Sequence, residues 1–312
     1  MGFFVTAQQV VIMFALMAIG VVATKLGWLS SKVMPGLTNI LVYFVTPAVI
    51  LQAFHRPFDL DRFRDFGLVL GIDVISYLLL IAIVYLLFNR RLVADTDRRR
   101  ALRFGSIYSN AGFLGIPLAQ ALLGPDGVFF AVVFVVAFNF FVWTHGFGMF
   151  PRPPGTTRRH QLTQFLGNPN FLGLLVGLVL FIGSIPLPNL VVEGLGYVAA
   201  MNAPLSMIII GVSLAALSWR DLFADGWTWV GTAVRNLLLP LICLGLLTFV
   251  PLDETTRLAI LIPLACPVAA FLVMFSVMRR LDTSFATRYL FVSTLMSVIT
   301  IPTALALAHV IW

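Results

Sequence analysis

A hydrophobic segment interrupted near its centre limits what this chain can fold into. The segment carries Asn110, Gly112, Gly115 and Pro117 within eight positions. Proline lacks a main-chain donor and clashes with the preceding helical turn, and glycine weakens a helix further. In hydrocarbon, an opened main chain is tolerated only where protein or trapped water satisfies its polar groups. The segment therefore predicts a transmembrane helix that is broken near the membrane centre and lines a polar cavity.

A second hydrophobic segment, in the other half of the chain, is interrupted by Pro263 and Pro267, with the small residue Cys266 between them. Taken alone, such prolines suit a packing kink as well as a binding site. Two Gly- or Pro-interrupted helices at corresponding places in two halves are the sequence sign of a transporter binding site. We therefore expect both breaks to contribute to one site.

The composition places most of the chain inside a membrane. Hydrophobic residues make up 60% of the 312 residues and charged residues 11%, whereas a soluble domain carries about 25% charged residues. The net charge of +7 comes from basic residues in short loops, which suits membrane anchoring and not nucleic-acid binding. Cys243 and Cys266 both lie in hydrophobic segments, so we expect neither a disulfide nor a metal site.

Hydrophobic stretches of about 20 residues predict membrane-spanning helices. Ten are present, at 5–24, 36–54, 67–88, 101–123, 127–148, 168–184, 190–217, 227–250, 256–278 and 284–309. The basic, Pro/Gly-rich stretch after Phe150 divides them into five and five. We predict an all-α membrane protein with a first five-helix repeat at 1–150, a cytoplasmic linker at 151–167 and an inverted second repeat at 168–312.

The loop charges predict the orientation. Most Lys and Arg residues lie in odd-numbered loops, among them Arg98, Arg158 and Arg280. The positive-inside rule puts these loops in the cytoplasm and both termini outside the plasma membrane. Since each half holds an odd number of spans, the two halves insert with opposite orientation, as in secondary transporters with inverted repeats.

The residues at the first break suit an anion site. Asn110 offers an amide near the membrane centre, and Gly112 and Gly115 allow close main-chain approach. Pro117 suits the first turn of the outer half-helix, whose N-terminal dipole favours a negative charge. The alternative is a kinked packing helix, because Gly and Pro are common in membrane helices.

Two charged residues lie well inside predicted spans, away from the span ends. Asp73, in span three, is a candidate for binding a proton or a coupling ion. The alternative is that it lies at the outer rim of that span. Arg235, in span eight, offers a guanidinium fork to a substrate carboxylate. The alternative is that its side chain extends to the cytoplasmic interface.

Other functional classes find no support in the motifs. The chain shows no nucleophile elbow, paired His/Glu metal site or phosphate-binding loop, and no channel filter. We therefore predict no enzyme activity, no catalytic residues and no cofactor.

Several motifs together resemble the auxin efflux carrier family in its short bacterial form, which includes malate and malonate permeases. They are Thr46-Pro-Ala-Val-Ile-Leu51, Asn110-Ala-Gly-Phe-Leu-Gly-Ile-Pro117, Asn168-Pro-Asn170, Ala203-Pro-Leu-Ser206, Gly211-Val-Ser-Leu214 and Ser293-Thr-Leu-Met-Ser-Val-Ile-Thr-Ile-Pro302. The resemblance runs almost end to end. One departure concerns the residues after Pro267, where many bacterial relatives carry a polar side chain and this chain has Ala269 and Ala270.

The resemblance implies crossed broken helices in spans four and nine. It also implies a scaffold of spans one, two, six and seven, which pairs as a homodimer, and a mobile transport unit made of the other spans. It places Asn110 at the substrate carboxylate beside Pro117 and Pro267, and Asp73 at an acidic support site. We expect a carrier of small mono- or dicarboxylates with elevator-type alternating access. A sodium- or proton-coupled symporter of the bile-acid type, or a sensor without transport, are the alternatives.

Overall fold

The computed structural model describes residues 3–151, 167, 169–215 and 225–312. Most of the predicted linker, with Arg152, Arg158 and Arg159, therefore lies outside the described residues, as do Asn168 and Arg220. The rest of the chain is helical, and the only β-type pairing in the described part is one isolated bridge. The predicted all-α fold class is confirmed.

The first half of the chain holds these elements: α1 (Phe3–Lys25), η1 (Ser31–Val33), α2 (Met34–Ile40), η2 (Leu41–Val45), α3 (Thr46–Phe54), α4 (Leu60–Leu87), α5 (Thr96–Ile107), η3 (Ala111–Gly115), α6 (Ile116–Phe141) and η4 (Val142–Gly146). The elements η2, η3 and η4 are π-helical turns; η2 joins α2 to α3, η3 leads directly into α6, and η4 continues from the end of α6. Gly124 interrupts α6 with φ of 68°, a conformation that glycine adopts without a steric penalty.

The second half holds α8 (Pro169–Ile182), α9 (Asn189–Ala200), α10 (Asn202–Ala215), α12 (Gly226–Ala233), η5 (Val234–Leu238), α13 (Leu239–Leu247), α14 (Glu254–Ala265), α15 (Phe271–Met278) and α16 (Ser284–Ile311). A fourth π-helical turn, η5, joins α12 to α13. Turns of this kind are rare and often occur at functional sites.

Six helical segments in the described part are long and apolar enough to cross a membrane. They are Met34–Phe54, Leu60–Leu87, Ala111–Gly146, Asn189–Ala215, Gly226–Leu247 and Ser284–Ile311. Two apolar helices are shorter, at Val11–Lys25 and Pro169–Ile182. These segments make the chain a multi-pass membrane protein, whereas the division into ten spans and two inverted repeats stays a prediction.

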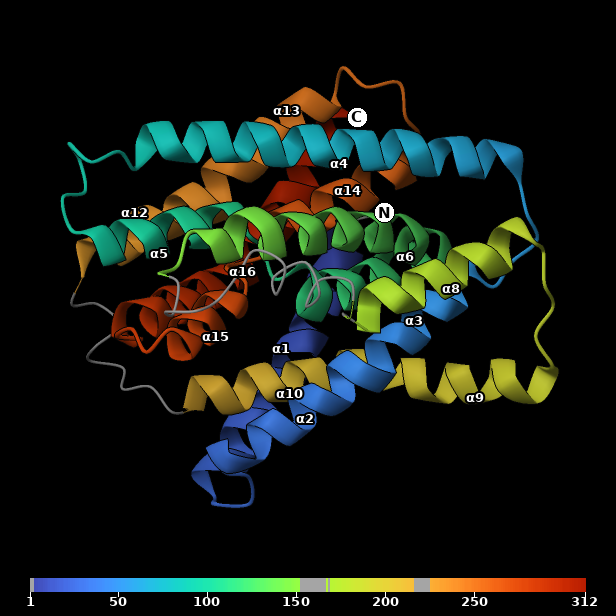
Figure 1. Ribbon diagram of the computed structural model, residues 1–312, viewed down its shortest axis with the longest axis horizontal. Coiled ribbons are helices and arrows are strands. Elements are labelled where there is room, and N and C mark those ends of the chain that lie inside the picture. Colours follow the sequence, from blue (N-terminus) through green and yellow to red (C-terminus); the bar gives the residue numbers. More distant parts are fainter. Residues whose placement is uncertain (1–2, 152–166, 168, 216–224) are drawn as a thin grey trace.

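The bundle has α6 and α14 at its centre. Figure 1 shows α4 along one side of the molecule and α9 and α10 along the opposite side, with α6 and α14 between them. Helix α1 packs along α10, and α3 packs against α8 and α9, while α12 packs against α16. The centrally placed α6 and α14 also pack on each other.

The contact between α1 and α10 depends on two glycines. A Cβ atom added to Gly211 would lie 2.0 Å from the main-chain oxygen of Met17, and one added to Gly20 would lie 2.4 Å from that of Ile208. Small residues let membrane helices approach closely, which replaces the hydrophobic driving force that is missing in lipid.

We predict that Gly211→Ala separates α1 from α10 and destabilises the protein by about 1–3 kcal/mol, because the new methyl group overlaps a main-chain atom that cannot give way. Thermal unfolding of the purified protein in detergent measures the change. The control is Gly194→Ala in α9, where an added Cβ meets no atom within 4 Å. Equal unfolding temperatures for the two variants would contradict this packing.

Candidate functional site

Both predicted breaks are present, and they lie side by side. Helix α5 ends at Ile107, and helical structure resumes at Ala111. Helix α14 ends at Ala265, and α15 begins at Phe271. Each break leaves main-chain groups without a partner in their own helix.

The two breaks satisfy each other's main chain. Ser109 and Val268 form an antiparallel bridge. The Asn110 N–H donates to the Pro267 carbonyl at 2.7 Å, and the Ala269 N–H donates to the Tyr108 carbonyl at 2.9 Å. Inside a membrane these hydrogen bonds take the place that water would fill in a soluble protein. The crossing is therefore a closed main-chain contact between segments far apart in the sequence.

Helix α16 supports the second break through a serine. The Ser293 hydroxyl accepts from the Val268 N–H at 3.0 Å and donates to the Asn236 side-chain oxygen at 2.7 Å. The Asn236 amide in turn donates to the Ser293 carbonyl at 2.7 Å. This network is buried and holds the strand-like part of the break against α16 and η5.

Arg235 lies next to Asn236 on η5 and is fully buried, which excludes the predicted alternative of an interfacial side chain. Its guanidinium donates to main-chain carbonyls at the ends of both inner half-helices. Nη1 reaches Ser106 at 2.9 Å and Ile107 at 3.3 Å, Nε reaches Cys266 at 3.1 Å, and Nη2 bonds Leu264. In this structure the predicted fork therefore binds the protein's own main chain.

The outer half-helix that follows Asn110 starts earlier than the sequence predicts. Pro117 lies in the first turn of α6, but the π-helical turn η3 extends the helix back to Ala111. The N–H of Ile116 bonds the carbonyl of Ala111, five residues back, so the wider turn accommodates the proline ring and its missing donor. The N-terminus of this half-helix is thus at the crossing itself.

The two glycines of the motif have different surroundings. A Cβ added to Gly115 would lie 3.3 Å from Cα of Pro263 and 3.5 Å from Sγ of Cys266, so Gly115 permits the contact with α14. An added Cβ at Gly112 would meet no atom within 4 Å. The buried Asn110 side chain makes no capping bond to η3 and remains available for other partners.

Asp73 lies in the middle of α4 and is 0% exposed, which favours a position inside the span over the predicted alternative of a rim position. Among the described residues, neither carboxyl oxygen finds a hydrogen-bond partner. Tyr77, one helical turn further along α4, also has a buried hydroxyl without a partner in that part of the chain. An unpartnered acid at this depth is costly and marks a candidate functional position.

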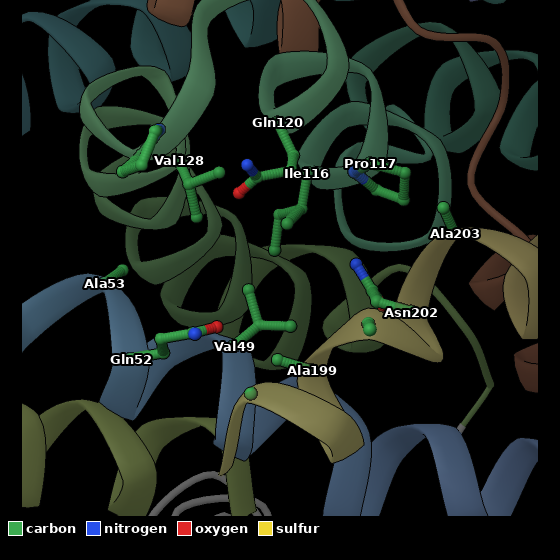
Figure 2. Close-up of a pocket in the computed structure, with 13 residues that line it drawn as sticks. Val49, Gln52, Ala53, Ile116, Pro117, Gln120, Val128, Ala199, Asn202 and Ala203 are labelled. Atoms are coloured by element: carbon green, nitrogen blue, oxygen red, sulfur yellow. The ribbon is translucent and has the colours of Figure 1, made fainter. Parts of the chain in front are cut away.

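A cavity of about 380 Å³ lies beside α6, and Figure 2 shows side chains from α3, α6, α9 and α10 around it. Of the predicted site residues, only Pro117 lines it. The sequence analysis missed its three amides, Gln52, Gln120 and Asn202. Gln120 follows Pro117 by three residues and so shares its helix face. An amide side chain inside an apolar segment is a sequence signal that all three share, and the spacing from Pro117 adds a second signal for Gln120.

A family model described as membrane transport protein matches residues 5–164 and 157–305, almost the whole chain. The chain belongs to this family of membrane transporters. The family is that of the auxin efflux carriers, so the resemblance found in the sequence is confirmed.

Two archaeal members of the family match nearly end to end. A protein of Methanothermobacter thermautotrophicus, named an uncharacterized transporter, is 22% identical over 302 residues, which cover 97% of this chain and 98% of that protein. An uncharacterized transporter of Methanocaldococcus jannaschii is 22% identical over 299 residues, which cover 94% and 95% of the two chains. This chain is thus a membrane transporter of the same family.

We predict that Ser293→Ala destabilises the protein by about 1–3 kcal/mol, because it removes the hydroxyl that pairs with the buried Val268 N–H and with the side-chain oxygen of Asn236. Thermal unfolding in detergent measures the loss. The control is Thr303→Ala on the same helix, where an exposed hydroxyl bonds only its own helix. A Ser293→Ala protein as stable as this control would show that the serine does not support the break.

Proposed function

We propose that this protein is a secondary carrier that moves a small organic anion, a mono- or dicarboxylate, across the plasma membrane. The observation that carries the proposal is the crossing of two broken helices around a buried guanidinium. Crossed half-helices near the membrane centre form the substrate sites of secondary transporters.

The crossing favours a negative substrate. The outer half-helices that begin at Ala111 and Phe271 both start there, and helix N-termini carry a partial positive charge. The opposing negative ends, at Ile107 and Ala265, are occupied by the guanidinium of Arg235. The unneutralised partial charge at the crossing is therefore positive. Asn110, at the start of η3, adds an amide that can donate to a carboxylate oxygen.

The cavity suits the polar part of such a substrate. Its volume of about 380 Å³ falls within the range of small-molecule sites. Figure 2 shows the amides of Gln52 and Gln120 pointing into the space between α3 and α6. Amides bind carboxylates and hydroxyls without adding charge, which suits a site that must also release its ligand. Under the predicted orientation the cavity lies on the outer side of the crossing.

The helix contacts are compatible with the ten-span inverted repeat and with elevator-type movement. In this proposal the scaffold comprises α1, α2–α3, α8 and α9–α10, which pack on one another. The transport unit comprises α4–α6 and α12–α16 and carries the crossing. The scaffold also offers the homodimer surface, since α9 has no buried residue and exposes Leu190 and Tyr197. Both termini lie outside the cell.

A proton-coupled symporter is the second candidate, and Asp73 favours it. A buried carboxyl group without a partner is neutral when protonated and costly when charged, so it can gain and lose a proton as its surroundings change. Proton coupling requires one such group, whereas a sodium site requires several oxygen ligands.

We predict that Asn110→Ala reduces carboxylate uptake in proteoliposomes at least tenfold, because an amide in the site contributes about 1.5 kcal/mol or more to binding a charged ligand. Gln120→Leu, which keeps the side-chain size, should raise the substrate concentration needed for half-maximal uptake. The control is Leu86→Ala, a change at an exposed position near the end of α4. Undiminished uptake by Asn110→Ala would refute this site, and no uptake by the wild type from a panel of carboxylates would favour a sensor.

We predict that Asp73→Asn abolishes the stimulation of uptake by an inward proton gradient while substrate still stabilises the protein. The amide cannot exchange a proton but fills the same space as the acid. Uptake at several external pH values, with substrate-dependent thermal shifts, separates coupling from binding. Asp61→Asn, an exposed change on the same helix, is the control. If the wild type shows no response to the gradient, the second candidate is wrong.

A further inference from the structure

Four main-chain oxygens from two separate helix ends converge on one side-chain cation. Ser106 and Ile107 supply two of them from the end of α5, and Leu264 and Cys266 supply the others from the end of α14. The guanidinium of Arg235 is fully buried among them.

Converging carbonyl oxygens form the type of site that binds an alkali cation. In transporters with broken helices, unwound carbonyls and the C-terminal ends of half-helices coordinate sodium ions. Each helix C-terminus carries roughly half a negative elementary charge, so two of them together balance about one positive charge. The charge of one guanidinium therefore matches the two ends that it bonds.

We propose that Arg235 is a resident cation that permanently fills a monovalent-cation site formed by the two inner half-helices, so that the carrier requires no sodium ion. Arginine stays protonated at any physiological pH, so this site keeps its charge throughout the transport cycle. The planar fork, with five donors, reaches all four oxygens, which a single ammonium group on lysine does not.

The surroundings of Arg235 support this assignment over an ordinary ion pair. Among the residues that the structure describes, no carboxylate bonds Arg235. Within the described part of the chain its hydrogen bonds go to main-chain oxygens, which a free cation would also use. The next residue, Asn236, holds Ser293 and so fixes the π-helical turn that delivers the guanidinium to the crossing.

The first test uses thermal unfolding of the purified full chain in detergent. Arg235→Ala should unfold at a lower temperature than the wild type. Guanidinium chloride, at low-millimolar concentrations far below those that denature proteins, should raise that temperature. Tetramethylammonium chloride, which is larger and has no N–H donor, should not. The wild type should respond to neither salt, nor to replacing sodium by potassium or choline.

The matched control is Arg99→Ala. Arg99 also donates to main-chain carbonyls, those of Val93 at 2.6 Å and Ala94 at 3.0 Å, but near the start of α5 and away from the crossing. Guanidinium should not raise the unfolding temperature of Arg99→Ala as it raises that of Arg235→Ala. An equal effect on Arg99→Ala and Arg235→Ala would mean that the salt acts generally, and the proposal would be wrong.

Two further variants keep the proposal testable if Arg235→Ala does not fold. Arg235→Lys retains the charge without the fork, and Arg235→Gln retains donors without the charge. The lysine variant should unfold at the higher temperature of the two. If the glutamine variant is as stable as the lysine variant, the positive charge is not what the site requires, and the proposal is overturned.

The uptake experiments rest on the proposed carrier function, whereas the thermal-unfolding experiments do not. Wild-type uptake in proteoliposomes should be unchanged when sodium is replaced by potassium or choline. Guanidinium should restore uptake by Arg235→Ala but not by Asn110→Ala. Sodium-dependent wild-type uptake would overturn the resident-cation proposal and leave the carrier proposal intact. A failure to transport any carboxylate would refute only the carrier.

Discussion

The structure depends on how main-chain polar groups find partners where there is no water. Two helices are open near the centre of the bundle, and each exposes N–H and C=O groups that hydrocarbon cannot satisfy. The chain meets this requirement by bringing the two breaks together. The main-chain N–H groups of Asn110 and Ala269 donate across the crossing to the carbonyls of Pro267 and Tyr108, respectively. The Arg235 guanidinium donates to carbonyls at the ends of the two inner half-helices.

The two helix breaks are supported by different interactions. The second break has a side-chain support, because Ser293 of α16 accepts from the Val268 N–H. The first break relies on its main-chain hydrogen bonds to the second break and on the guanidinium of Arg235. The hydroxyl of Ser109 has no partner among the described residues. The two buried charged residues that the sequence singled out also differ from each other. The Arg235 guanidinium donates hydrogen bonds to four main-chain carbonyls, whereas the Asp73 carboxyl group has no hydrogen-bond partner among the described residues.

Helices α5, α12 and α16 approach closely because a tyrosine of α16 packs against glycines of α5 and α12. Tyr289 of α16 lies between Gly105 of α5 and Gly231 of α12, where an added Cβ would overlap its ring. Its hydroxyl bonds the Gly231 carbonyl at 2.9 Å and lies 2.9 Å from the Ser106 hydroxyl. The tyrosine therefore fixes the inner half-helix α5 against α12, the element that leads into η5 and Arg235.

The sequence by itself determined the membrane class, the family and the places where two helices break, because hydrophobic length and the missing donor of a proline are local properties. It also singled out Asp73 and Arg235, since charge is rare in these segments. Only the tertiary structure decided the partners. Arg235 bonds carbonyls rather than offering an open fork, and the cavity is lined by Gln52, Gln120 and Asn202 around Pro117. A hydrogen-bond partner or a cavity wall comes from elements distant in the chain, and their placement depends on packing that no local pattern encodes.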